Sequence, residues 1–214
     1  MLERRQFEFI TDFLVNKVGI NLENGPWLCG GAARGMFLGD YESIDDFDLY
    51  FQNQKSFEET RQKILVNISS PNSAYESANT NNALTLVIAV TGNEVLVKSD
   101  NIFTQHIDLG TSSEVAVQCI KKGFYPTVRD ALGSFDFTVC TIATDCKGKF
   151  IYLPEFLDDE KNKRLRLRNQ PSKQFLRRWL KYSAYGYDMP VGELEAVFNE
   201  MQDQLDFRGS PDEY

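Results

Sequence analysis

The chain has 214 residues, 42% of them hydrophobic, and a formal net charge of −8. This length and apolar content suffice for one large packed domain with a small appendage, which excludes wholesale disorder. The acidic balance argues against non-specific coating of nucleic acid. No apolar run approaches the ~20 residues of a membrane span.

Helices and strands alternate in the first half. Apolar residues recur at three- and four-residue steps near the N-terminus, which predicts a helix. Gly39 suits a helix C-cap, and Ser56 with Glu59 has capping-box spacing. Residues 69–82 are rich in Ser and Asn, which predicts a mobile loop. The other predicted elements are a helix over 3–18, a strand over 27–29, a helix over 32–38, a strand over 45–51 and a helix over 56–66.

The second half begins with two β-rich runs around Gly92-Asn93, which predict a hairpin. Val115, Ala116 and Cys119 are spaced as on the inward face of a helix, ended by Gly123. The polar tail after residue 205 is expected to fray. The predicted elements are the hairpin 83–91/94–98, a helix over 112–122, strands over 135–144 and 150–152, a helical turn over 153–158, and helices over 172–185 and 190–205.

The N-terminus is charged and amphipathic and lacks the apolar core of a signal peptide. We therefore expect a cytoplasmic protein, in the host cytoplasm if the chain is viral. The four cysteines form no CxxC pair and the chain has one histidine, so the sequence predicts reduced thiols instead of a zinc site.

The chemistry centres on residues 27–51. Asp46 and Asp48 lie two residues apart on a predicted strand, so their side chains point to the same face and can bind one ligand together. Gly30-Gly31 lets the backbone approach a ligand closely, and the following helix aims free amide N–H groups at anions. A phosphate-binding turn that faces two metal-binding acids is the arrangement that nucleotidyl transfer requires, with two Mg²⁺ ions as cofactor.

These residues carry a resemblance. Residues 30–35, GGAARG, followed by Asp46-Phe47-Asp48, resemble the DNA-polymerase-beta-like nucleotidyltransferase superfamily, closest to the head domain of poly(A) polymerases and tRNA CCA-adding enzymes. Residues 135–140, FDFTVC, resemble a second segment of that class. The resemblance covers about residues 25–168 and implies an α+β nucleotidyltransferase fold, a mixed central β-sheet flanked by helices. The length of the chain and the helices expected after residue 171 predict a small C-terminal helical appendage, with domains over 1–168 and 169–214. The compact size is similar to that of small phage or bacterial members.

The resemblance implies roles residue by residue. Asp46 and Asp48 match the metal ligands, and Gly30, Gly31 and Arg34 match the triphosphate-side turn and helix. Asp136 matches an acid at the nucleotide, as a ribose contact or third metal ligand. Each of three residues also has an alternative role. Glu94 competes with Asp136 as the third metal ligand, or is a solvated residue of the hairpin. Arg34 pairs on the surface with Asp40 or Asp45, and Asp136 forms hydrogen bonds in the core. The family's arginine pair is replaced by Ser134-Phe135 and its asparagine by Cys140, which leaves base selection open.

A basic stretch follows over residues 161–181. Lys173, Arg177 and Lys181 can share one helical side and face a nucleotide or RNA, or form a solvated helical face. The leading hypothesis is a Mg²⁺-dependent nucleotidyltransferase that uses a nucleoside triphosphate such as ATP. Its acceptor is left open between RNA, a small molecule and a protein. One alternative is a catalytically inactive module on the same fold, acting as a phage structural or accessory protein or as an antitoxin-like interaction protein. The other is a plain α+β binding domain.

Overall fold

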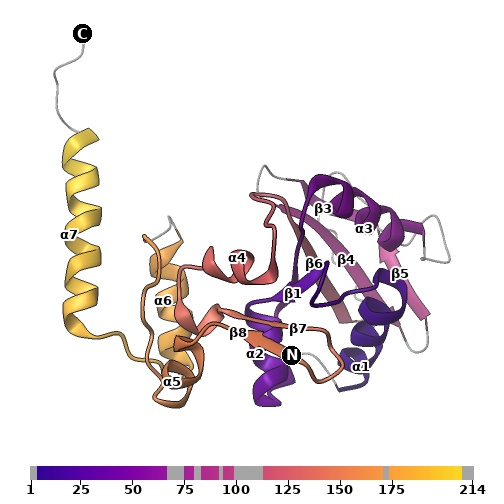
Figure 1. The fold of residues 1–214 in the computed structure, drawn as a ribbon, viewed down its shortest axis with the longest axis horizontal. Helices are drawn as coiled ribbons and strands as arrows, with labels where there is room; N and C mark the ends of the chain where they lie inside the picture. The colour runs from indigo at the N-terminus through magenta and orange to yellow at the C-terminus, as the bar shows by residue number, and fades with distance from the viewer. Residues whose placement is uncertain are drawn as a thin grey trace, which may run out of the picture. The chain divides into compact units, whose positions relative to one another are not determined.

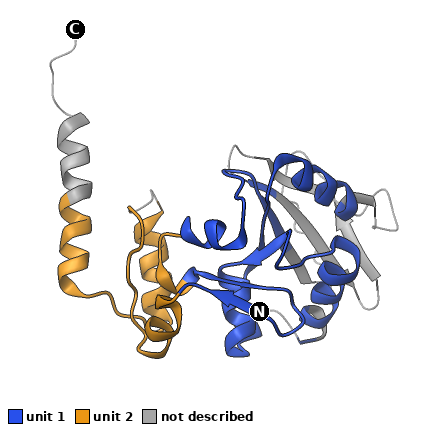
Figure 2. Cartoon of the chain, viewed as in Figure 1, with its two compact units in different colours: residues 1–134, 140–153 blue, residues 135–139, 154–214 orange. Residues whose placement is uncertain are grey.

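The computed structural model describes residues 4–66, 75–79, 83–91, 94–98, 113–170 and 174–208. Its contacts divide the chain into two compact units (Figure 2). Unit 1 comprises residues 1–134 and 140–153, and unit 2 comprises residues 135–139 and 154–214. The domain boundary drawn at residue 168 from the sequence stays a prediction.

Unit 1 carries one mixed sheet in the order β3-β4-β6-β2-β1-β7-β8, with β5 paired to β4. β2 and β6 pair in parallel, and the other pairs are antiparallel. This mixed sheet with flanking helices confirms the predicted α+β class. The strands are β1 (Trp27–Cys29), β2 (Asp46–Tyr50), β3 (Tyr75–Asn79), β4 (Ala83–Thr91), β5 (Glu94–Lys98), β6 (Ser113–Ile120), β7 (Ile142–Thr144) and β8 (Phe150–Tyr152).

The main hydrophobic core of unit 1 lies between its sheet and the helices α1 and α3 (Figure 1). α1 continues as one π-helical turn, Leu14–Val18, and ends at Gly19 with φ 84°. Ile10, Leu14 and Ile64 are fully buried there against Phe47 and Leu49 of β2. The helices of unit 1 are α1 (Arg4–Phe13), α2 (Gly31–Leu38), α3 (Gln54–Val66) and α4 (Val128–Gly133).

Unit 2 is built from helices and short connecting segments. Its core includes Phe137, which packs against Phe175 and Tyr182 with ring centroids 5.9 Å apart in both pairs. Its helices are α5 (Glu155–Lys161), α6 (Phe175–Ala184) and α7 (Val191–Arg208). Among the residues that the structure describes, no helix combines the length and apolar character that a membrane crossing needs.

The strand–turn–helix–strand prediction over 27–51 is confirmed, as are the hairpin of β4 and β5 and the helices near both ends of the chain. The helix predicted over 112–122 is wrong, because this segment is the strand β6. β6 pairs with β2 on one side and with β4 on the other. Val117 and Cys119 therefore alternate into the core with a period of two.

Three smaller predictions are also corrected. Within the loop predicted over 69–82, residues 75–79 form β3, whose backbone pairs with β4, and the rest of that range lies outside the described residues. The strand predicted over 135–144 is divided into an isolated bridge at Phe137, a 3-10 turn over Thr138–Cys140 and the short β7. α3 begins before Ser56, because the Asn53 side chain accepts a hydrogen bond from the Ser56 N–H at 2.9 Å and caps the helix one turn earlier.

Candidate active site

Two acids alternate with core residues along β2. Phe47 and Leu49 are fully buried, whereas Asp46 and Asp48 are half-buried. Since side chains of a strand alternate between its faces, the two acids share the face opposite the main core. The structure thus places Asp46 and Asp48 as the spacing predicts.

The register brings these acids to the end of β1. Cys29, the last residue of β1, pairs across the sheet with Asp48. Burial raises the pKa of the Cys29 thiol well above its ordinary value, and the negative charge of Asp48 raises it further. Asp48 thus lies directly across the sheet from the residue immediately before Gly30.

Gly30 turns the chain from β1 into α2. Its φ of 73° and ψ of −134° lie in a region that side chains with a Cβ avoid. The turn is fixed by two backbone hydrogen bonds of 2.9 Å, from the Gly30 N–H to the carbonyl of Ile142 and from the Arg34 N–H to the carbonyl of Gly30. At Gly31, the first residue of α2, an added Cβ would meet nothing within 4 Å. The backbone at the start of α2 is thus approachable, as a phosphate cradle requires.

Arg34 lies one turn into α2 and is only 5% exposed. The two predicted roles of Arg34, at the triphosphate and in an ion pair with Asp40 or Asp45, both stay predictions. α2 packs against β1, β2 and β7, so Arg34 belongs to the element that links the glycine turn to the acidic strand.

Gln118 of β6 was not singled out from the sequence. It pairs with Asp48 in the parallel register, and its Nε2 donates a hydrogen bond of 2.9 Å to Oδ2 of Asp46. Gln118 therefore orients one of the two acids. Its position between core residues Val117 and Cys119 is the signal that a strand interpretation of this segment would have used.

The donor set fits Mg²⁺ with substrate. Mg²⁺ is usually held by one or two carboxylates together with water and substrate phosphates, not by an all-protein cage. Asp46 and Asp48 supply two carboxylates on one face. In the described parts of the chain, no group of three or more His, Cys, Asp or Glu side chains could hold a metal ion.

The remaining predicted site residues belong to unit 2 or have side chains that are not described. Asp136 belongs to unit 2, is 7% exposed, and accepts two hydrogen bonds of 2.7 Å from Nη1 of Arg178. Arg177 and Lys181 are exposed on α6. Lys173 lies outside the described residues, as does the side chain of Glu94 at the start of β5. The third-ligand role of Asp136 or Glu94 stays a prediction.

Solved structures with the same fold include CCA-adding enzymes. The Thermotoga maritima CCA-adding enzyme complexed with tRNA is 14% identical, with a TM-score of 0.52 over 88% of this chain and 40% of that chain. A CCA-adding enzyme complexed with CTP is 13% identical, with a TM-score of 0.58 over 97% of this chain and 46% of that chain. The chain thus spans less than half the length of these enzymes. Because the sequence identities are this low, the structural similarity shows the fold alone, and that fold is nucleotidyltransferase-like.

A search of curated proteins found no match. Residues 1–163, which include the glycine turn and both acids of β2, match the family described as Gabija anti-defense 2 family protein. The match extends over more than half of the chain, so the chain belongs to the Gabija anti-defense 2 family.

Proposed function

We propose that the chain is a Mg²⁺-dependent nucleotidyltransferase, which moves a nucleoside monophosphate from a nucleoside triphosphate such as ATP to a hydroxyl of an acceptor. The observation that carries the proposal is the pairing of Asp48 with Cys29, the residue before the Gly30-Gly31 turn. This register holds two acids and an approachable helix start in one small region of the sheet.

Each part has a defined task in the proposed reaction. The backbone N–H groups that open α2 bind the β- and γ-phosphates, and Gly31 leaves room for them. Asp46 and Asp48 hold Mg²⁺, and Gln118 keeps the Asp46 carboxylate in its orientation. Bound Mg²⁺ supplies charge neutralisation on the phosphates and favours ionisation of the acceptor hydroxyl.

The transfer itself is a substitution at phosphorus. The acceptor oxygen forms a bond to the α-phosphorus, the bond between the α-phosphorus and the bridging oxygen breaks, and pyrophosphate leaves with that electron pair. The hydroxyl proton passes to solvent. The acceptor stays open between RNA, a small molecule and a protein side chain.

The test is pyrophosphate release from each ribonucleoside triphosphate with Mg²⁺, in the presence of RNA or cell extract as a source of acceptor. Asp46→Asn and Asp48→Asn are expected to lower the rate by roughly 100-fold or more while leaving the fold intact, because both charges face the phosphates. Asp12→Asn is the matched control, since Asp12 is exposed on α1 and bonded to Asn16. Equal turnover in the wild type and both site variants refutes the proposal.

Family membership favours a second candidate, an interaction module that counters the Gabija defence without transferring a nucleotide. The two candidates differ in what Asp46 and Asp48 must do. We expect Asp48→Asn to abolish protection of phage on Gabija-carrying cells if transfer is the mechanism. Full protection by this variant, at equal protein level, would instead support the module.

A further inference from the structure

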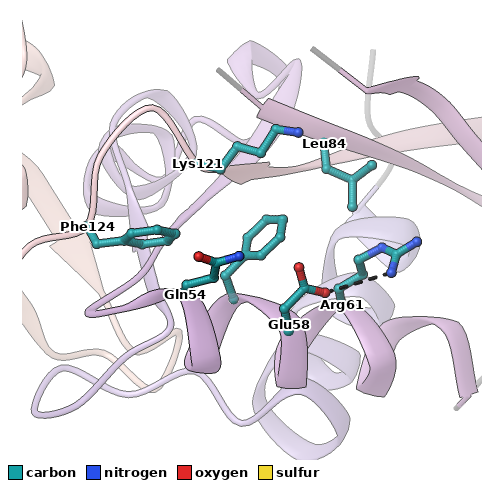
Figure 3. Close-up of a pocket in the computed structure, with 7 residues that line it drawn as sticks. Gln54, Glu58, Arg61, Leu84, Lys121 and Phe124 are labelled. Atoms are coloured by element: carbon teal, nitrogen blue, oxygen red, sulfur yellow. Dashed lines mark ion pairs between the residues drawn. The ribbon is translucent and has the colours of Figure 1, made fainter. Parts of the chain in front are cut away.

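A pocket lies on the face of the unit 1 sheet opposite to the acids. It has a volume of about 400 Å³ and is lined by α3, the start of β4 and the segment after β6 (Figure 3). Leu84, in its lining, belongs to the main core with Phe47 and Leu49, whereas Asp46 and Asp48 point to the opposite face. The volume lies within the range of small-molecule sites.

One part of the pocket is apolar and aromatic. Leu84 is 1% exposed and Phe57 is 6% exposed, so both form buried lining, whereas Phe124 is 38% exposed. The ring centroids of Phe57 and Phe124 are 6.5 Å apart at an angle of 59°. An aromatic ligand would therefore find a partly exposed aromatic ring beside a buried apolar surface.

The segment that carries Phe124 is fastened to the end of β2. The Tyr125 N–H donates to the carbonyl of Phe51 at 3.1 Å, and Nε2 of Gln52 donates to the carbonyl of Pro126 at 3.0 Å. These bonds are made by the two residues that follow Phe124, and they hold this side of the pocket against the chain after β2. The aromatic surface is thus already formed, which reduces the entropy lost when a ligand binds.

The other part of the pocket is cationic. Arg61 comes from α3 and Lys121 from the segment after β6, so two separate elements bring positive charge to one small volume (Figure 3). Glu58 is the acid in the lining. Its Oε2 is 3.8 Å from Nη1 of Arg61, and its side chain is 49% exposed, so solvent screens that pair. The pocket also lies where the parallel strands β2 and β6 end, the usual edge for ligands in open sheets.

We propose that this pocket binds a small aromatic anion of the nucleoside monophosphate class, with its ring against Phe124 and its anionic group between Arg61 and Lys121. The site is separate from the nucleotidyltransferase site and does not rest on the transfer reaction. Its binding needs no Mg²⁺, because the chain's own cations neutralise the anion.

The test is isothermal titration of the four ribonucleoside monophosphates into the full chain in the presence of EDTA. We expect at least one to bind at one site per chain. Arg61→Ala and Lys121→Ala should each weaken binding roughly tenfold, since each removes a charge-assisted hydrogen bond. Lys55→Ala is the matched control, because Lys55 is 86% exposed and pairs with Glu59 along the same helix. Asp48→Asn should bind as the wild type does.

Several results would overturn this assignment. One is no heat of binding with any of the four monophosphates. Another is equal binding by Arg61→Ala, Lys121→Ala and Lys55→Ala. A third is loss of binding in Asp48→Asn, which would place the ligand at the nucleotidyltransferase site. Thermal melts of every variant exclude unfolding as the cause of a loss.

Discussion

Gly35 lies inside α2, where this helix packs against the loop that leads into β2. An alanine Cβ there would lie 2.7 Å from Cγ1 of Ile44 and 2.9 Å from the carbonyl oxygen of Asp40. The Asp40 backbone cannot withdraw freely, because its N–H donates to the Gly35 carbonyl at 2.9 Å. Gly35→Ala therefore tests how closely α2 packs against the loop that leads into β2.

The expected magnitude combines two opposing effects. Overpacking costs about 1–3 kcal/mol, and two contacts shorter than 3.0 Å, one of them with backbone, place Gly35→Ala in the upper part of that range, at about 2–3 kcal/mol. Alanine is favoured over glycine inside a helix by about 1 kcal/mol, which offsets part of that cost. The net loss of unfolding free energy for Gly35→Ala is therefore about 1–2 kcal/mol, or about 2–8 °C in Tm for a chain of this size.

The assay is thermal and urea unfolding followed by circular dichroism. Gly133→Ala is the control, because Gly133 ends α4 and a Cβ there meets nothing within 4 Å. The control should be neutral or slightly stabilising. If Gly35→Ala is as stable as the wild type, the packing argument for α2 is wrong.

Three further perturbations probe the site and the core. Gly31→Ala should keep or slightly raise the Tm, since its Cβ meets nothing, but should weaken triphosphate binding roughly tenfold by obstructing the helix start, as measured by titration. Gln118→Leu should raise the Mg²⁺ concentration for half-maximal turnover by about 10–100-fold, because Asp46 loses its orienting donor. Burial raises the pKa of Cys119 and Cys146 to about 12 from the usual 9, which lowers the fraction of reactive thiolate. At pH 8, iodoacetamide should therefore label these two thiols roughly a thousandfold more slowly in the folded chain than in the urea-unfolded chain. The same pKa shift lowers the free energy of unfolding as the pH rises from 9 to 12, because these thiols ionise in the unfolded chain before they ionise in the folded chain.

The strand–turn–helix–strand segment was predictable because its signals are local. Gly30-Gly31 marks a turn, Gly39 ends a helix with φ 68°, and the alternation around Asp46 and Asp48 has the period of a strand. Each signal acts within a few residues. Tertiary contacts strengthen these elements without changing their type.

The segment 113–120 was not predictable in this way. Val115, Ala116 and Cys119 satisfy a helical spacing, while Val117 and Cys119 satisfy a strand spacing, so its period is ambiguous. Pairing with β2 and β4, far away in the sequence, decides the outcome. Gln118 was missed for the same reason, because its role exists only once β6 lies beside β2. The pairing of Asp136 with Arg178 likewise depends on a contact between residues 42 positions apart.

The most direct test of the central claim is electron paramagnetic resonance of Mn²⁺, which substitutes for Mg²⁺, titrated into the chain with a non-hydrolysable nucleoside triphosphate analogue. The account predicts that the wild type and Asp12→Asn bind the Mn²⁺–nucleotide complex, whereas Asp46→Asn and Asp48→Asn lose it without a change in Tm. Equal Mn²⁺–nucleotide binding by all four proteins, or by none, would contradict the assignment of the two acids.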